Sequence, residues 1–372
     1  TDEGERSRGA LIQNAAYILQ FGYEKSNSNT ADPRHGDRLF DYGYIGNFDL
    51  TWEPSINIIV EPIAPDTVEI YPGQVDYTRF FNGFTPGTVN PVLTRYIHNA
   101  ADATDFNDFE LRNGLIPTNL STVWGLHTNV GAVYDRFNKG VDERITFNAN
   151  TSFELVPSGS GNARHNIQMG FMYEERISRS YTVAPVGLWT VARLHANEHI
   201  EGQGLDSTQV LYTIDGQYIK LNTFTGDSLI TDIQVPIFAP NIVTTSNDNL
   251  FFKKVREKLN LPLNQYVNVD GMDPSDLSLD MFSARELNDL SLLSYYGYDY
   301  LGNELTGTTF DDFFTHKDAN GIRDFPVAAF RPNYQSAYIQ DKFTFKDIIF
   351  RLGVRVDRYD ANTKVLRDPY SL

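Results

Sequence analysis

Long segments in which apolar and polar residues alternate constrain the fold of this chain more than any other feature. Strict alternation is the pattern of a β-strand with an apolar face on one side and a polar face on the other. Such segments lie near residues 15–24, 40–52, 144–155, 166–176, 336–345 and 349–359. The pattern predicts an all-β fold of antiparallel strands.

Short turns join two pairs of these strands. The stretch 157–162 is rich in glycine and serine, and residues 346–347 separate the last two segments. Both stretches favour tight turns and predict β-hairpins. The other connections, residues 53–143 and 177–334, are far longer than the loops of a compact soluble domain.

The order of short and long connections favours a membrane barrel. Outer-membrane barrels have short turns on the periplasmic side and long loops outside. On this pattern, residues 24–38, 156–164 and 346–348 are periplasmic turns. The expected fold is a transmembrane antiparallel β-barrel whose long extracellular loops contain short helices. Charged and polar strand residues would face its wet lumen, and those predicted to do so are Asp41, Asn47, Asp49, Arg351 and Arg355.

Composition fits this interpretation and excludes several classes of function. The longest apolar runs, such as residues 56–60, are far shorter than the roughly 18 residues of a membrane-spanning helix. A barrel strand needs only about 10 alternating residues. The net charge of −17 opposes binding to nucleic-acid phosphates. The absence of cysteine excludes disulfides, thiol nucleophiles and cysteine–zinc sites.

Helical signals occur within the second long connection. Ser283 and Glu286 have the spacing of a capping box before Leu287. Residues 250–259 have weaker helical spacing, and residues 188–194 also suit a helix. We therefore expect short helices within this connection.

One sequence in that connection, His195-Ala196-Asn197-Glu198-His199, matches the H-x-x-E-H pattern of inverted zinc peptidases. On a helix, two such histidines lie one turn apart and bind zinc while the glutamate activates water. The alternative is a partly buried element that packs within the loop. A five-residue match is weak evidence, and the sequence contains no nucleophile-elbow pattern. We predict that the protein is not an enzyme.

A second candidate site is a calcium loop. Asp318, Asn320 and Asp324 offer oxygen ligands beside the turn residue Gly321, but no bidentate glutamate follows. The alternative is an ordinary Asn-Gly turn with solvated charges. Apart from calcium in the loops, no cofactor is expected.

Aromatic residues are candidates for a substrate-binding surface. Rings stack on sugars and peptides, and they equally form the packed core of a large loop. The residues are Trp189, Tyr295, Tyr296, Tyr298 and Tyr300, together with Trp124. Both interpretations stay open at this point.

Several motifs resemble TonB-dependent outer-membrane receptors, specifically the large type found in Bacteroidetes. The barrel hairpin of that family is similar to Ser336 through Phe343 followed by Phe350 through Tyr359. The further similar motifs are Tyr44 to Asp49, Ile167 to Glu174, Ser294 to Tyr300 and Phe310 to Phe314. They are spread over nearly the whole chain. The hairpin motif is common to many barrels, whereas the loop motifs are more specific.

The resemblance implies a barrel of about 22 strands around a plug in the outer membrane of a Gram-negative cell. It implies active import of a bulky nutrient, whether oligosaccharide, peptide or chelate. The implied partners are outer-membrane lipid, the TonB energy-coupling protein acting through the plug, and a surface lipoprotein. The sequence contains no recognisable plug, so we expect residues 1–372 to be a central barrel-and-loop portion of such a receptor.

A different class of function also fits the sequence. The chain would then be a non-transporting outer-membrane barrel or a secreted β-protein whose long loops bind a protein partner.

Overall fold

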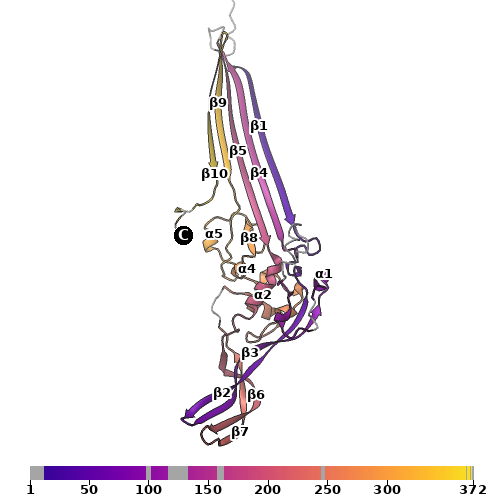
Figure 1. Ribbon diagram of the computed structural model, residues 1–372. Helices are drawn as coiled ribbons and strands as arrows, with labels where there is room; N and C mark the ends of the chain where they lie inside the picture. Colours follow the sequence, from indigo (N-terminus) through magenta and orange to yellow (C-terminus); the bar gives the residue numbers. More distant parts are fainter. Residues whose placement is uncertain are drawn as a thin grey trace, which may run out of the picture.

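The computed structural model describes residues 12–97, 102–115, 133–156, 163–243, 248–365, 367–368 and 370. These residues form two antiparallel sheets with short helices between them (Figure 1). The chain is therefore mostly β, as the alternation predicted. Neither sheet closes on itself within the described ranges. No helix in these ranges is both long and apolar enough to cross a membrane.

The larger sheet, called the long sheet below, has the strand order β1-β4-β5-β9-β10, and every neighbouring pair is antiparallel. Short β8 (Leu293–Tyr296) pairs with the end of β5. The five main strands are β1 (Ile12–Thr30), β4 (Phe137–Leu155), β5 (Ala163–Val183), β9 (Asn333–Phe345) and β10 (Ile348–Asp360).

The two predicted hairpins are confirmed. Strand β4 pairs with β5, although their turn at 157–162 lies outside the described residues. Strands β9 and β10 are joined by a two-residue turn, in which Lys346 has a left-handed φ of 52°. A positive first φ suits a tight hairpin because it matches the twist of the flanking strands.

The second sheet has the order β2-β3-β6-β7. It consists of two hairpins that pair with each other over only four residues of each inner strand, Thr67–Ile70 and Ile219–Asn222. Figure 1 shows it at the far end of the molecule from the β9–β10 turn of the long sheet. Its strands are β2 (Gly46–Ala64), β3 (Thr67–Pro86), β6 (Leu205–Asn222) and β7 (Ser228–Pro240).

Several predictions about connections are wrong. Residues 24–38 are no turn of the long sheet, because β1 continues through Thr30 and pairs with β4. Segment 40–52 begins in a 3-10 helix and continues as β2 of the second sheet. The supposed loops 53–143 and 177–334 contain β3, β6, β7 and β8. Alternation identifies a strand, but it does not identify the sheet that the strand joins.

Short helices pack between the two sheets. They include both segments with helical spacing, and the capping box of Ser283 and Glu286 is confirmed. The helices are α1 (Pro91–Thr94), α2 (Leu188–Ala196), α3 (Phe251–Leu259), α4 (Ala284–Asn288) and α5 (Asp312–Thr315).

The centre of this helical region is a dense aromatic core. Trp189 is fully buried and lies between Phe40 and Tyr44, with ring centroids 5.7 Å and 5.4 Å away. Its indole N–H donates to the carbonyl of Phe40 at 3.0 Å. Burying a ring of this size stabilises a fold by a few kcal/mol. The core therefore anchors η1 (Leu39–Asp41) to α2 across 149 residues of sequence.

A buried arginine fixes the relative position of α2 and α3. Arg256 donates to the carbonyl of Ala196 at 2.6 Å and to that of Gln265 at 2.7 Å. It also donates to the side chain of Asn197 at 2.9 Å. Burial lowers the pKa of Arg256 to about 10, so it stays charged at neutral pH. Its positive charge sits at the negative end of the α2 dipole.

Candidate functional site

One face of the long sheet is apolar over most of its length. Successive residues of a strand point to opposite faces, so alternate residues share a face and the register lines them up across strands. Leu19 is 67% exposed and Val354 66% exposed on this face. One row across the five strands consists of Leu19, Ala149, Phe171, Ala337 and Val356. The adjacent row consists of Tyr17, Thr151, Met169, Ile339 and Val354.

The opposite face of the long sheet is mainly polar. Arg355 donates to Asp357 at 3.0 Å and to the hydroxyl of Tyr334 at 2.9 Å. Arg351 lies opposite Lys342 in the β9–β10 register. One row on this face consists of Gln20, Asn148, Met172, Ser336 and Asp357. The adjacent row consists of Ile18, Asn150, Gly170, Tyr338 and Arg355.

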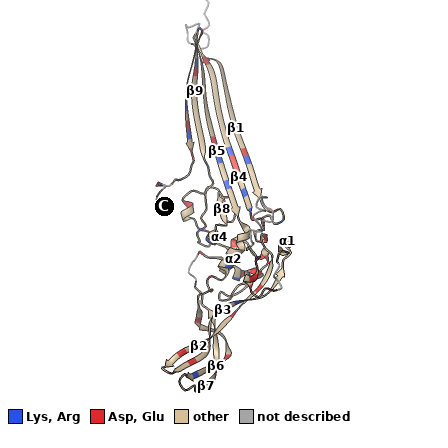
Figure 2. Cartoon of the chain, in the orientation of Figure 1, with Lys and Arg blue, Asp and Glu red and all other residues tan. Residues whose placement is uncertain are grey.

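Charged residues mark the end of the apolar face nearest the helices. There Glu143 accepts from Arg179 at 3.1 Å and lies 3.3 Å from Lys25. Figure 2 shows charged residues on β4 and β5 toward this end of the long sheet. Nearer the turns, Asp341 interrupts the apolar rows, and its carboxylate lies 2.7 Å from Nδ1 of His165. The apolar face is therefore a band with a charged border on the helical side.

The predicted lumen-facing residues divide into two groups. Arg351 and Arg355 share the polar face of the long sheet, as their alternation predicted. Asp41, Asn47 and Asp49 do not belong to this sheet, so they do not share its polar face. Asp41 is buried in η1 beside Arg38, and the other two lie on β2 of the second sheet.

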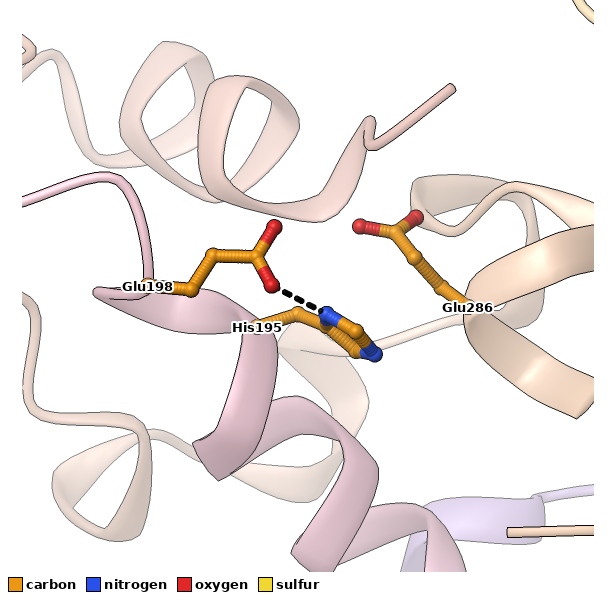
Figure 3. A group of neighbouring side chains, drawn as sticks. All are labelled: His195, Glu198 and Glu286. Atoms are coloured by element: carbon orange, nitrogen blue, oxygen red, sulfur yellow. Dashed lines mark hydrogen bonds and ion pairs between the residues drawn. The ribbon is translucent and has the colours of Figure 1, made fainter. Parts of the chain in front are cut away.

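A buried group of ionisable side chains is the second candidate site. His195, Glu198 and Glu286 have ligand atoms within 4.8 Å of one another, and Figure 3 shows both carboxylates beside the imidazole. Nδ1 of His195 lies 2.7 Å from Glu198, and Nε2 lies 3.0 Å from Asp289. Helix α2 supplies the histidine and α4 supplies Glu286.

The pKa values in this group reflect burial opposed by charge. Burial alone lowers the pKa of His195, but its bond to Glu198 and the charges of Glu198, Glu286 and Asp289 leave it raised. Burial raises the pKa of Glu198, but the bond to His195 outweighs this and leaves it lowered. The two residues therefore favour an imidazolium–carboxylate pair.

The carboxylate of Glu286 already accepts hydrogen bonds from the backbone of the protein. Its carboxylate accepts the backbone N–H of Ser283 at 2.7 Å and those of Leu250 and Phe251 at 3.1 Å. It thereby caps its own helix and the N-terminus of α3. Burial raises its pKa in spite of these donors. Three backbone donors satisfy the carboxylate without an ion.

The peptidase arrangement does not form among the described residues. Helix α2 ends at Ala196, so His195 and His199 do not share one helical face. His199 instead stacks on Phe252 with ring centroids 4.3 Å apart, and its Nε2 lies 2.8 Å from the carbonyl of Leu263. Burial lowers the pKa of His199 to about 4. The packing interpretation of this motif therefore fits the structure.

The predicted aromatic binding surface is wrong for most of its members. Trp189, Tyr298 and Tyr300 are buried in the core, and Tyr295 packs against it with its hydroxyl donating to Phe325 at 3.1 Å. Tyr296 is 37% exposed, and Tyr295 is partly exposed. Trp124 lies outside the described residues.

The predicted calcium ligands are engaged in separate contacts. Asp318 accepts the backbone N–H of Asn320 at 2.8 Å and that of Ile322 at 2.9 Å, which makes an Asx turn. Asp324 lies 2.7 Å from Nδ1 of His316. The structure therefore gives each carboxylate a protein donor, as the alternative interpretation of an ordinary turn requires.

Comparison with known proteins does not assign this chain to a family. No family model, no curated protein and no solved structure matches it.

Proposed function

We propose that the long sheet is part of an outer-membrane β-barrel and that the chain serves import in a TonB-dependent receptor of a Gram-negative cell. The observation that carries the proposal is the division of five strands into one apolar and one polar face. Alternation within one strand is common. A band of exposed apolar side chains that stays in register across five strands is the arrangement of a wall between lipid and water.

The height of the band supports the proposal. From Leu155 to Ile145 the apolar face of β4 extends over ten residue steps, or about 33 Å at about 3.3 Å per residue. A strand tilted by about 40° then spans about 25 Å, which is the height of the apolar belt of outer-membrane barrels. The charged border at Glu143 lies beyond that span.

The open edges of the long sheet support a larger barrel. The outer edges of β1 and β10 have no neighbouring strand among the described residues. Unpaired backbone groups in hydrocarbon cost several kcal/mol each, so a membrane sheet needs further strands to close it. The long connections at one end would lie outside the cell, and the short turns would face the periplasm.

Import, the plug and coupling to TonB are proposed from the resemblance of the sequence motifs. The partners would be outer-membrane lipid, the TonB protein acting through a plug, and a surface lipoprotein. The nutrient would be an oligosaccharide, peptide or chelate.

The alternative, a barrel or secreted protein whose outer region binds a protein partner, is favoured by one observation. The second sheet carries an apolar row across all four strands, composed of Val60, Ile70, Ile219 and Ile230. Val60 and Ile230 are both more than half exposed.

Spin labels on single cysteines test the membrane proposal, because the natural chain contains none. The apolar-face variants are Leu352→Cys and Val354→Cys, and their matched controls on the polar face are Arg351→Cys and Arg355→Cys. In lipid vesicles, we expect oxygen to relax the first pair and a water-soluble nickel chelate to relax the second. Equal access of the nickel chelate to all four labels would refute a lipid-facing band.

Energy-coupled uptake separates import from the alternative. Import requires accumulation of a labelled nutrient that stops when TonB is deleted, whereas a binding barrel retains partner binding without accumulation.

A further inference from the structure

A cavity of about 500 Å³ lies where the second sheet meets the segment that follows α3. Its size falls within the range of small-molecule sites. It is separate from the apolar band and from the His195 group. The residues that give it chemical character are Trp52, Tyr77, Tyr266, Asn264, Gln265 and Asn268.

Three aromatic rings form one wall of this cavity. The rings of Trp52 and Tyr266 are stacked with centroids 5.2 Å apart and planes inclined by 8°. The ring of Tyr77 lies 5.5 Å from Tyr266. All three side chains are partly exposed. Stacked rings of this kind offer a flat, rigid apolar surface to a ligand.

Amide groups line the cavity beside the rings. Asn268 donates to the carbonyl of Phe48 at 2.7 Å, while its side-chain oxygen is buried and lacks a hydrogen-bond partner within the described part of the chain. This bond holds the Asn268 side chain in place among the residues that line the cavity. Asn264 and Gln265 add further amides, each both donor and acceptor.

Charge restricts the ligand further. Neither a basic nor an acidic side chain lines the cavity, so nothing there offsets the desolvation of an ionic ligand. The net charge of −17 also repels anions. The hydroxyl of Tyr266 remains protonated because burial raises its pKa, and it supplies another neutral donor.

A pyranose ring has the matching chemistry. Its C–H face is flat and apolar, and its rim carries neutral hydroxyls that both donate and accept. A proline-rich peptide would also pack on the rings, but it offers few groups to the three amides.

We propose that this cavity binds a neutral carbohydrate, with a sugar ring packed on the wall of Trp52 and Tyr266. Its role as a capture site for an imported nutrient rests on the proposed transport function, whereas the binding itself does not.

Calorimetric titration of the full chain with neutral hexasaccharides of glucose, xylose, mannose and N-acetylglucosamine tests the proposal, with hexaproline as the peptide probe. We expect saturable binding of at least one sugar. Tyr266→Ala should weaken it at least tenfold. Asn264→Ala, which removes no hydrogen bond within the described part of the chain, should weaken it about tenfold. Phe224→Ala, which removes an exposed aromatic ring outside the cavity, should leave the affinity unchanged.

The proposal is overturned if no sugar binds, if hexaproline binds in place of sugars, or if both cavity variants retain the affinity of the natural chain. A negative result for sugar binding does not change the result of the spin-label experiment. The carbohydrate proposal and the membrane proposal can therefore be rejected independently. Sugar binding combined with water access to Leu352→Cys would support the cavity and reject the membrane band.

Discussion

The carboxylate of Glu286 accepts the backbone N–H of Phe251 at 3.1 Å, so α4 caps the helix that begins 35 residues before that glutamate. The same carboxylate completes the capping box of its own helix with Ser283. One buried side chain therefore holds two helix N-termini together, where unpaired N–H groups and the helix dipole both favour a negative charge.

Replacing this glutamate should open the start of α3. Glu286→Ala leaves the N–H groups of Leu250 and Phe251 without their acceptor, which costs about 2 kcal/mol. Hydrogen exchange at those two amides should become about 30-fold faster. Ser283→Ala is the matched control, since it removes one cap but keeps the Glu286 carboxylate at α3. Unchanged exchange at Phe251 in Glu286→Ala would contradict the cap.

The stability of the His195 region should depend on pH. The pKa of His195 is raised, so its contribution is complete below its ordinary value of 6.5 and is lost as pH rises through the raised value. The pKa of Glu198 is lowered, so its contribution is complete above 4.5 and is lost as pH falls through the lowered value. The pKa of Glu286 is raised, so its contribution to stability is complete below its ordinary value of 4.5 and is lost as pH rises through the raised value.

The expected result is maximal protection of the α2 backbone amides near pH 5 to 6, declining above pH 6.5. Exchange measured by mass spectrometry across this range checks it. His195→Gln should remove the decline attributed to the imidazole, and a pH profile identical to that of the natural chain would contradict this assignment.

Trp189 should prove essential for folding and Tyr296 should not. Trp189→Ala leaves a large cavity between Phe40 and Tyr44 and should destabilise the helical region by about 3–5 kcal/mol. Tyr296→Ala removes a partly exposed ring and should change stability by less than about 1 kcal/mol. Limited proteolysis of the helical region compares the two variants. Equal resistance would mean that Trp189 is not part of the core.

Charge on the two faces of β9 should have unequal effects. Ile339→Lys places an ammonium near the middle of the apolar band and should oppose membrane insertion by about 2–4 kcal/mol. Gln340→Lys puts the same charge on the polar face of the same strand and should cost little. Folding yield into vesicles measures the difference. Equal yields would remove the distinction between the faces.

Local patterns predicted much of this structure because they depend on neighbouring residues. Alternation correctly predicted that Arg351 and Arg355 lie on one face of β10. The spacing of Ser283 and Glu286 correctly predicted the start of α4. Helical spacing located α3, and short turns located both hairpins. The wall of the carbohydrate cavity had no such signal, since Trp52 and Tyr266 are more than 200 positions apart in the chain.

The sequence by itself determined that the strands have one apolar and one polar face, because the side-chain period of a strand is local. The tertiary structure decided which strands are neighbours. It paired β1 with β4 and sent β2 into a different sheet, although both β1 and β2 alternate. It also buried Trp189 and turned His199 away from His195. Pairing and burial depend on contacts between distant residues, and these form only where the whole chain can bury its apolar surface together.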